Sequence, residues 1–343
     1  MKNRVSLKDI ADVVGVSASL VSYVLNNKGK ENRVSEETAK KIREVAEELN
    51  YQPNQIARSL KSKRSQSIGL IVADISNPFF SNMARTIEDE AHSSNYTVIF
   101  GSSDENSTKL KKVLDFLTTR QVDGFIIAPT EGCKETVAEL SKQKIPFVLI
   151  DRYFEDLSTN YVIIDNFQAS MDAVDHLLKR GHTRIGLVAY RSELIHFRNR
   201  IRGYKEALKK AGVDPGLEFI KEVSYAAFEE EMKTAVRELI YEDKAEAIFF
   251  CTNTLAIEGL KQIFSLGRKV PEEIDVVAFD QSIAYDFFEY FIPHISQPIK
   301  EIGQEAVRAL IEQINNKTEE TRHICLRAKL EARQAPADEL KMV

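Results

Sequence analysis

Cysteine is scarce in this sequence, and its spacing does not suggest a cross-linked or metal-bound fold. The 343 residues include only three cysteines, Cys133, Cys251 and Cys325, which are far apart and odd in number. No CxxC pair and no cluster of cysteine with histidine occurs. Disulfide frameworks and zinc sites need such closely spaced sets. The sequence therefore supports neither a disulfide framework nor a metal site.

Long apolar segments are also missing. The N-terminus has no apolar stretch of the kind found in export signals, and no run of about 18 apolar residues occurs. We therefore expect a cytoplasmic protein without membrane contact. The sequence also lacks GxGxxG, GxSxG, HExxH and P-loop motifs, so it predicts no enzyme and no bound cofactor.

Positive charge is concentrated at one end of the chain. Residues 1–64 hold 13 Lys and Arg against 8 Asp and Glu, a net charge of +5, whereas the remainder carries a net charge of −10. This asymmetry indicates a module that binds a polyanion, attached to an acidic body. The length predicts two or three domains.

The basic segment reads as a series of short helices. Ser6, Ser17 and Ser35 are each placed to cap a helix, and Gly15 falls at a tight turn between the first two helices. Apolar residues recur at helical spacing after each serine. They are Leu7, Ile10, Ala11 and Val14 in the first helix, Leu20, Val21, Val24 and Leu25 in the second, and Ala39, Ile42, Val45, Ala46 and Leu49 in the third. The pattern predicts a helix-turn-helix, although most short helical pairs do not bind DNA.

Beyond Ser65 the pattern changes to apolar strands that alternate with amphipathic helices. Such alternation indicates parallel sheets covered on both faces, with enough units for two doubly wound domains. Ligands of these folds bind beyond the carboxyl ends of strands. Polar residues found at those ends are Asp74, Asp104, Asp151, Asp165, Thr252, Asn253 and Asp280. Any one of them is more simply a helix cap, but together they predict the rim of a cleft.

The residues LKDIADVVGVSASLVSYVLNN and RVSEETAKKIREVAEELNYQPNQIARSLKSKRSQSIGLIV resemble the LacI/GalR family of bacterial transcriptional regulators, and the resemblance continues to about residue 334. It implies an all-α helix-turn-helix headpiece at 1–52, a hinge helix and linker at 53–65, and an α/β two-lobed sensor at 66–336, similar to type I periplasmic binding proteins. Lobe 1 would comprise about 66–164 and 295–323, lobe 2 about 165–294 and 324–336, and the tail 337–343.

The resemblance also assigns residues to DNA. Ala18, Ser19 and Tyr23 hold the positions that read base edges, and Ser17, Ser22 and Asn26 are better placed for phosphates. Tyr23 stands where arginine is common, so an arginine–guanine pairing is not expected, and packing of Tyr23 on its own helix is the alternative. Leu20 replaces a polar residue that is common in relatives, which removes one expected phosphate contact.

The hinge segment NQIARSLK follows the headpiece. In the family, two such segments fold as helices on operator DNA, enter the minor groove and insert a leucine between base pairs. Leu60 holds the position of that wedge, and Asn54, Ala57 and Arg58 would line the groove. Packing of Leu60 against the sensor is the alternative. A helix this short is marginal in isolation, so its folding would depend on DNA.

For the sensor, the resemblance implies a small effector, a sugar or sugar derivative, held between the lobes. Carboxylates and an arginine can bind vicinal hydroxyls, and aromatic rings can stack on a sugar. The alternative places Phe79 in the core and His196 in a solvent-facing loop. The expected function is a homodimeric repressor on a pseudo-palindromic operator, and the alternative is a sugar-binding receptor without a DNA role. The implied effector residues are Phe79, Phe80, Asp151, His196, Arg200, Tyr225, Thr252, Asn253, Asp280 and Gln297.

The substitution Leu60→Ala tests the hinge assignment. We expect it to lower operator affinity while weak, salt-dependent binding to random DNA persists, because the wedge acts on bent specific DNA and the headpiece phosphate contacts remain. Binding to operator and to random duplex is measured side by side. An unchanged ratio of the two affinities would show that Leu60 is not a wedge.

Overall fold

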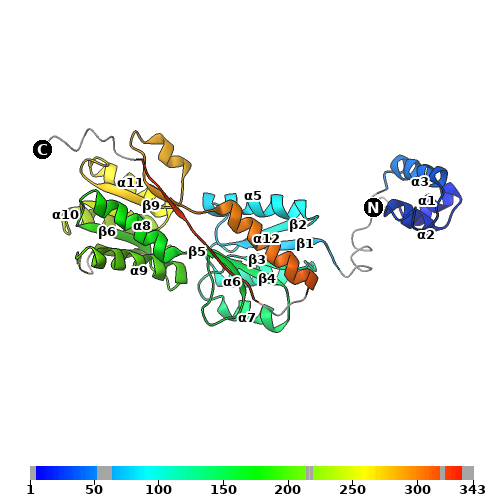
Figure 1. The fold of residues 1–343 in the computed structure, drawn as a ribbon, viewed down its shortest axis with the longest axis horizontal. Coiled ribbons are helices and arrows are strands. Elements are labelled where there is room, and N and C mark those ends of the chain that lie inside the picture. The colour runs from blue at the N-terminus through cyan, green and yellow to red at the C-terminus, as the bar shows by residue number, and fades with distance from the viewer. Residues whose placement is uncertain (1–4, 52–63, 214–215, 217–218, 317–320, 334–343) are drawn as a thin grey trace. The chain divides into compact units, whose positions relative to one another are not determined.

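The computed structural model describes residues 5–51, 64–213, 216, 219–316 and 321–333 of the chain. The chain separates into two units, residues 1–65 and 66–343. The elements of both units are labelled in Figure 1.

The first unit contains three helices with the caps that the sequence predicts. They are α1 (Leu7–Val14), α2 (Ala18–Leu25) and α3 (Glu36–Glu48). Ser6 and Asp9 form a reciprocal capping box, and the Ser17 and Ser35 side chains each accept a hydrogen bond from a backbone N–H of the following helix. Gly15 ends α1 at φ +82°, in the left-handed region that glycine favours.

A compact apolar cluster holds these helices together. Ile10 of α1, Val21 and Val24 of α2, and Ile42 of α3 are fully buried, and the remaining members of the predicted apolar stripes pack around them. The three stripes therefore meet in one core, and the polar side of α2 is left outside it.

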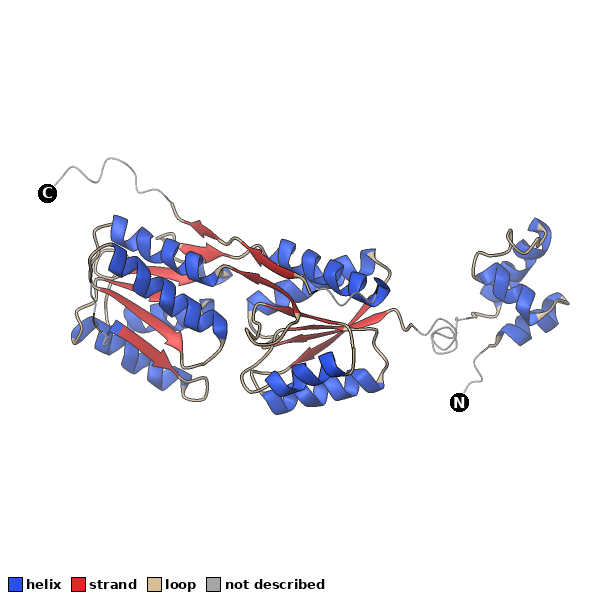
Figure 2. Ribbon diagram, turned by 60° about the horizontal axis from the view of Figure 1, so that its bottom comes forward, coloured by secondary structure: helices blue, strands red, loops and turns tan. Residues whose placement is uncertain are grey.

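The second unit contains, among its described residues, two six-stranded sheets, each the core of one lobe. Figure 2 shows helices on both faces of each sheet. In lobe 1 the sheet order is β11-β5-β4-β3-β1-β2, with all pairs parallel. The strands are β1 (Ser67–Val72), β2 (Thr97–Ser102), β3 (Phe125–Ile127), β4 (Phe147–Ile150), β5 (Asn160–Ile164) and β11 (His323–Leu326), and the helices are α5 (Pro78–Ser93), α6 (Ser107–Thr119), α7 (Lys134–Lys142) and α12 (Ile299–Asn316).

Lobe 2 repeats this architecture with the order β12-β10-β9-β8-β6-β7, and only β12 runs antiparallel to its neighbour. Its strands are β6 (Ile185–Tyr190), β7 (Ile220–Val223), β8 (Ala247–Phe250), β9 (Asp275–Phe279), β10 (His294–Ser296) and β12 (Lys329–Glu331). Its helices are α8 (Asn166–Lys179), α9 (Ile195–Lys210), α10 (Phe228–Tyr241) and α11 (Asn253–Ser265), with a 3-10 helix η2 (Ile283–Phe287).

Within the described residues the chain passes between the two sheets three times, after β5, β10 and β11. These passages differ from the expected lobe boundaries. Residues 294–296 pair with β9 in lobe 2, and residues 323–326 pair with β5 in lobe 1. The chain therefore enters lobe 1, and later re-enters lobe 2, a few residues after the boundaries expected at 295 and 324. Strand partners are set by tertiary pairing, which periodicity along the chain does not encode.

No helix among the described residues has both the length and the apolar character needed to cross a membrane.

Gly203 provides a test of the packing in lobe 2. It lies inside α9, where alanine is ordinarily about 1 kcal/mol more favourable than glycine. A Cβ at this position would overlap the Phe167 carbonyl oxygen and lie 2.8 Å from the Ser170 Cβ on α8. We therefore expect Gly203→Ala to lower the free energy of unfolding by about 1–3 kcal/mol, measured by urea denaturation. Lys205→Ala, at an exposed position of the same helix, should change it by less than about 0.5 kcal/mol. A stabilised Gly203→Ala protein would contradict the packing.

Candidate functional site

Helix α2 presents a polar surface that begins at its capped end. Ser17, Ala18, Ser19 and Tyr23 are exposed, Ser22 is half-buried, and the Tyr23 side chain is 40% accessible. Tyr23 therefore projects from the helix rather than entering its core. Ser19 and Tyr23 are four residues apart and share one face of the helix.

Asn26 is tied to the end of this helix. Its side-chain amide donates to the Ser22 carbonyl oxygen at 2.7 Å and approaches the Ser22 hydroxyl at 3.3 Å. These contacts fix both side chains near the C-terminus of α2. The expected hinge residues Asn54, Ala57, Arg58 and Leu60 lie outside the described residues, so their assignment stays a prediction.

The second candidate site is a cavity of about 250 Å³ in the second unit, where the carboxyl ends of strands from both lobes face each other. Nine of the ten predicted effector residues line it; Asn253 is buried beside it and donates to the Asn77 side chain across the lobes at 3.2 Å. The cavity wall also includes eight residues outside the predicted effector set. They are Asp74, Asn77, Asp104, Glu105, Arg152, Tyr190, Phe197 and Thr254.

Arg200 forms the charged floor of the cavity on lobe 2. Its Nε donates to the Asn166 side chain at 2.8 Å, its Nη1 donates to the Cys251 carbonyl oxygen at 2.6 Å, and its guanidinium group lies 3.5 Å from the centre of the Phe279 ring. These contacts hold the buried guanidinium in one orientation. The positive charge lies near the carboxylates of Asp151 and Asp280.

Two aspartates occupy equivalent places in the two lobes. Asp151 directly follows β4 and Asp280 directly follows β9, and both adopt left-handed backbone angles, with φ of +65° and +70°. Both side chains are buried. Gln297 donates to Asp280 at 2.6 Å. Burial raises the pKa of Asp280 to about 6 and raises that of Asp151, while Arg200 opposes both shifts.

Arg152, which is buried, and Glu105, which is half-buried, form an ion pair in the wall of lobe 1. Arg152 donates from Nη1 and Nη2 to the two carboxylate oxygens of Glu105, at 2.8 and 2.6 Å, and from Nε to Asp151 at 3.2 Å. Both residues could have been predicted from their position in the sequence, because Arg152 follows Asp151 and Glu105 follows Asp104, and both aspartates were expected at the cleft rim. Their pairing joins segments 47 residues apart.

Aromatic rings supply the apolar part of the wall. The rings of Tyr190 and Tyr225 are stacked with centroids 3.8 Å apart, and those of Phe79 and Phe80 meet edge to face at 5.0 Å. Phe79 is both a core residue and a lining residue, so the two expectations for it are compatible. Such rings can cover the apolar face of a sugar.

His196 lies in α9 and is buried, so the solvent-facing alternative for it is wrong. Burial and the nearby charges of Arg152 and Arg200 hold its pKa well below the ordinary value, and the ring therefore stays neutral. Its Nδ1 has no hydrogen-bond partner among the described residues. A buried polar atom of this kind at a cavity wall is suited to a ligand hydroxyl.

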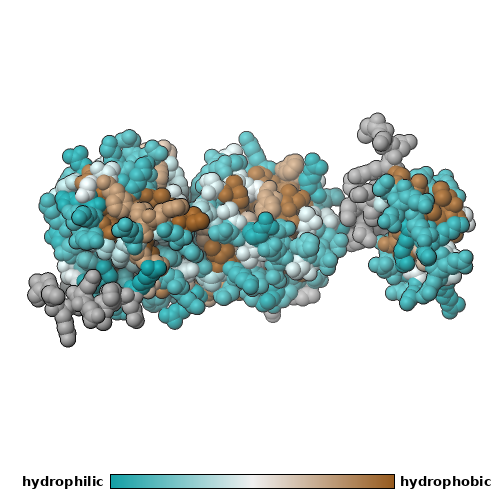
Figure 3. All heavy atoms as spheres, turned by 90° about the horizontal axis from the view of Figure 1, so that it is seen from above, coloured by the Kyte–Doolittle hydropathy of each residue, from teal (hydrophilic) through white to brown (hydrophobic). Residues whose placement is uncertain are grey.

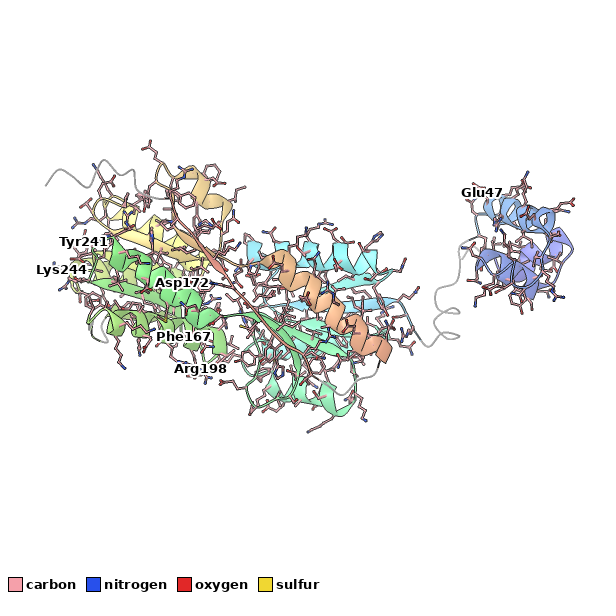
Figure 4. The ribbon with its side chains drawn as sticks, viewed as in Figure 1. Glu47, Phe167, Asp172, Arg198, Tyr241 and Lys244 are labelled. Carbon is pink, nitrogen blue, oxygen red and sulfur yellow. The ribbon has the colours of Figure 1, made fainter. Side chains whose placement is uncertain are left out.

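Two further contacts, between residues outside the cavity lining, connect the two lobes. Arg198 donates to Glu155 at 2.6 Å, and Ser192 donates to Glu131 at 3.0 Å. Figure 4 shows Arg198 at the side of lobe 2 that faces lobe 1. Among the described residues, no group of histidine, cysteine and acidic side chains is arranged to hold a metal ion.

Comparison with known proteins assigns both units to one family. Residues 65–334 match the model of periplasmic binding proteins and the sugar-binding domain of the LacI family, and residues 6–54 match the model of bacterial regulatory proteins of the lacI family. The chain is 34% identical to catabolite control protein A of Priestia megaterium over 333 residues, which cover 96% of this chain and 99% of that protein.

Solved structures agree with this assignment. A LacI family regulator from Enterococcus faecium with bound ribose is 28% identical, with a TM-score of 0.68 over 78% of this chain and 97% of that one. The Lac repressor dimer bound to operator shares the fold, with a TM-score of 0.83, 22% identity and coverage of 96% and 98%. The protein therefore belongs to the LacI family of bacterial transcriptional regulators.

Proposed function

We propose that this protein is a DNA-binding transcriptional repressor whose operator affinity is controlled by a small sugar bound between the two lobes. The observation that carries the proposal is a polar, aromatic-lined cavity between two sheets in the same chain as an exposed, capped helix of a helix-turn-helix. A receptor without a DNA role would leave the basic headpiece unexplained. The relatives of this protein are regulators rather than enzymes. We infer that this chain is also a regulator and that it acts in the cytoplasm.

The size and chemistry of the cavity favour a monosaccharide. Its volume of about 250 Å³ lies below the roughly 300–1,000 Å³ that is usual for drug-sized ligands. Asp151, Asp280 and His196 offer acceptors for hydroxyl groups, and the aromatic pairs offer flat apolar surfaces. Ribose is the first sugar to test, since a regulator 28% identical to this chain binds it.

Control of DNA binding would follow from contacts to both lobes. A ligand held by Asp151 of lobe 1 and by Arg200 and Asp280 of lobe 2 would stabilise one angle between the lobes, and that change would be transmitted to the hinge segments. A coupling free energy of about 1–3 kcal/mol would change operator affinity by roughly 5–150-fold. Asn54, Ala57, Arg58 and Leu60 remain the proposed minor-groove residues, with Ala18, Ser19 and Tyr23 in the major groove.

Two recognition helices are needed for a two-fold operator, and the second unit carries a surface suited to self-association. Ile257 and Phe264 of α11 and Ile283 and Phe287 of η2 are exposed apolar side chains. The Phe264 ring stacks on that of Phe288, which places α11 beside η2. Figure 3 shows apolar side chains gathered on one face of this unit. We propose that a second copy of the chain covers the surface formed by these four side chains.

The repressor assignment is tested on operator DNA. We expect a purified dimer to protect a pseudo-palindromic site with two half-sites, with affinity that falls steeply as salt rises because each neutralised phosphate releases counterions. Footprinting in a salt series, with and without ribose and other monosaccharides, gives both the extent of the protected site and the salt dependence of the affinity. A monomer that saturates one asymmetric half-site would rule out the dimeric repressor.

Asp280→Asn tests the ligand site without removing a structural anchor, because Arg200 is tied into the lobe 2 core by Asn166, Cys251 and Phe279 and would be disruptive to replace. We expect Asp280→Asn to weaken binding of the responding sugar by roughly 5–150-fold, since a carboxylate acceptor worth about 1–3 kcal/mol is lost. Sugar-free operator binding should stay near wild type. Calorimetric titration measures the first and a mobility-shift assay the second.

Asp286→Asn, at an exposed acid of η2 outside this cavity, is the matched control and should bind the sugar like the wild type. Normal sugar affinity in Asp280→Asn would contradict the assignment of the cavity, although the headpiece assignment would stand on its separate residues.

A further inference from the structure

We propose that Glu105 determines ligand specificity by occupying the phosphate-binding fork of Arg152, so that the cavity admits uncharged sugars and rejects phosphorylated ones. The proposal rests on the function assigned above, namely that the cavity between the lobes is the effector site. It concerns two residues, Glu105 and Arg152, that line that cavity and belong to different strand ends of lobe 1.

The guanidinium group of Arg152 is almost fully committed within the protein. Nε donates to Asp151 at 3.2 Å, Nη1 to Glu105 at 2.8 Å and to the Pro129 carbonyl oxygen at 3.1 Å, and Nη2 to Glu105 at 2.6 Å. A guanidinium has five N–H donors, so these contacts leave one. The paired contacts to Glu105 use the same fork geometry with which arginine binds a phosphate.

The positive charge of the other guanidinium in the wall, that of Arg200, is balanced by two nearby carboxylates. Arg200 is held by Asn166, Cys251 and Phe279 and lies near Asp151 and Asp280. His196 is neutral, because burial and both arginines lower its pKa. The described residues of the wall therefore include two arginines against five carboxylates, and one of these carboxylates, Asp104, is also paired with Lys109. The five are Asp74, Asp104, Glu105, Asp151 and Asp280.

This charge balance favours neutral sugars over phosphorylated sugars. A neutral polyol can donate hydroxyl hydrogens to the free carboxylate oxygens and to His196. A phosphate, by contrast, would bring about two further negative charges into a wall that is already negative, and juxtaposed like charges in a desolvated site cost several kilocalories per mole. The cavity is thus selective through repulsion as well as attraction.

The backbone around Glu105 shows that its placement is held against a local preference. Asp104 and Glu105 both have positive φ, at +49° and +53°, a conformation that is unfavourable for side chains other than glycine, asparagine and aspartate. The Glu105 amide donates to the Ala73 carbonyl oxygen at 3.0 Å, and Asp104 pairs with Lys109 and Ser102. These contacts fix the turn that aims Glu105 at Arg152.

The proposal predicts a clear order of affinities for the wild-type protein. Ribose, glucose and fructose are compared with ribose 5-phosphate, glucose 6-phosphate and fructose 6-phosphate by thermal shift and calorimetry, with inorganic phosphate as a further probe. We expect each phosphorylated sugar to bind at least about 100-fold more weakly than the cognate free sugar, and inorganic phosphate to leave the melting temperature unchanged. A phosphorylated sugar that binds more tightly than its free partner would overturn the proposal.

The substitution Glu105→Gln removes the negative charge and one of the two acceptor oxygens from the fork of Arg152, and should create a thermal shift with inorganic phosphate and with the sugar phosphates. Asp74→Asn is the matched control, since it removes a carboxylate from the same wall while its contact with Ser76, which an asparagine oxygen can also accept, is kept, and it should stay silent toward phosphate. The double variant Glu105→Gln/Arg152→Gln should lose the phosphate response that Glu105→Gln gains. Equal phosphate responses in Glu105→Gln and Asp74→Asn would show that general charge, rather than the fork, is responsible, and would overturn the role of Glu105.

The outcomes distinguish this proposal from the function on which it rests. If none of the free sugars binds the wild type but Glu105→Gln gains a phosphate response, the masking of Arg152 stands and the sugar assignment is wrong. If Glu105→Gln fails to fold because the buried Arg152 loses its ion-pair partner, the wild-type comparison of free and phosphorylated sugars decides the proposal. Operator binding is measured separately and depends on neither result.

Discussion

The buried charges between the two lobes are the constraint on which the sensor depends. Asp151, Arg152, Arg200 and Asp280 are all withdrawn from water, and a buried charge is tolerated only when it is paired and hydrogen-bonded. The two arginines are held by partners from more than one strand end: Arg152 by Glu105, Pro129 and Asp151, and Arg200 by Asn166 and Cys251. Removing one partner of a buried ion pair, such as Arg152 beside Asp151, typically costs about 3–5 kcal/mol, because the remaining charge is left uncompensated.

That constraint also explains why the site lies between lobes rather than within one. Parallel sheets end their strands at one edge, and β4 and β9 place Asp151 and Asp280 at corresponding edges of the two lobes. Asp151 pairs with Arg152 of its own lobe and lies near Arg200 of the other. A ligand between them completes an electrostatic arrangement to which both lobes contribute, so occupancy and lobe geometry are linked.

The two units have different physical demands. The headpiece is stabilised by a small core centred on Ile10, Val21, Val24 and Ile42 and by three serine caps, and the polar side of α2 remains exposed. The sensor places its polar chemistry inside and its apolar side chains Ile283 and Phe287 outside. Burial of polar groups suits small-ligand recognition, whereas exposed apolar side chains suit association with another protein surface.

The sequence by itself determined the features that depend on neighbours within one or two helical turns. Ser6, Ser17, Gly15 and the apolar stripes specify the headpiece helices through local hydrogen bonds and spacing, and strand ends marked Asp151 and Asp280 as rim residues. Only the tertiary structure decided that residues 294–296 pair with β9 and 323–326 with β5, that Asn253 contacts Asn77 beside the cavity, and that Glu105 occupies the fork of Arg152. Those contacts join segments that are far apart in the chain. The residue pattern within one segment does not specify which distant segment it will pair with, because that choice depends on the packing of the whole fold.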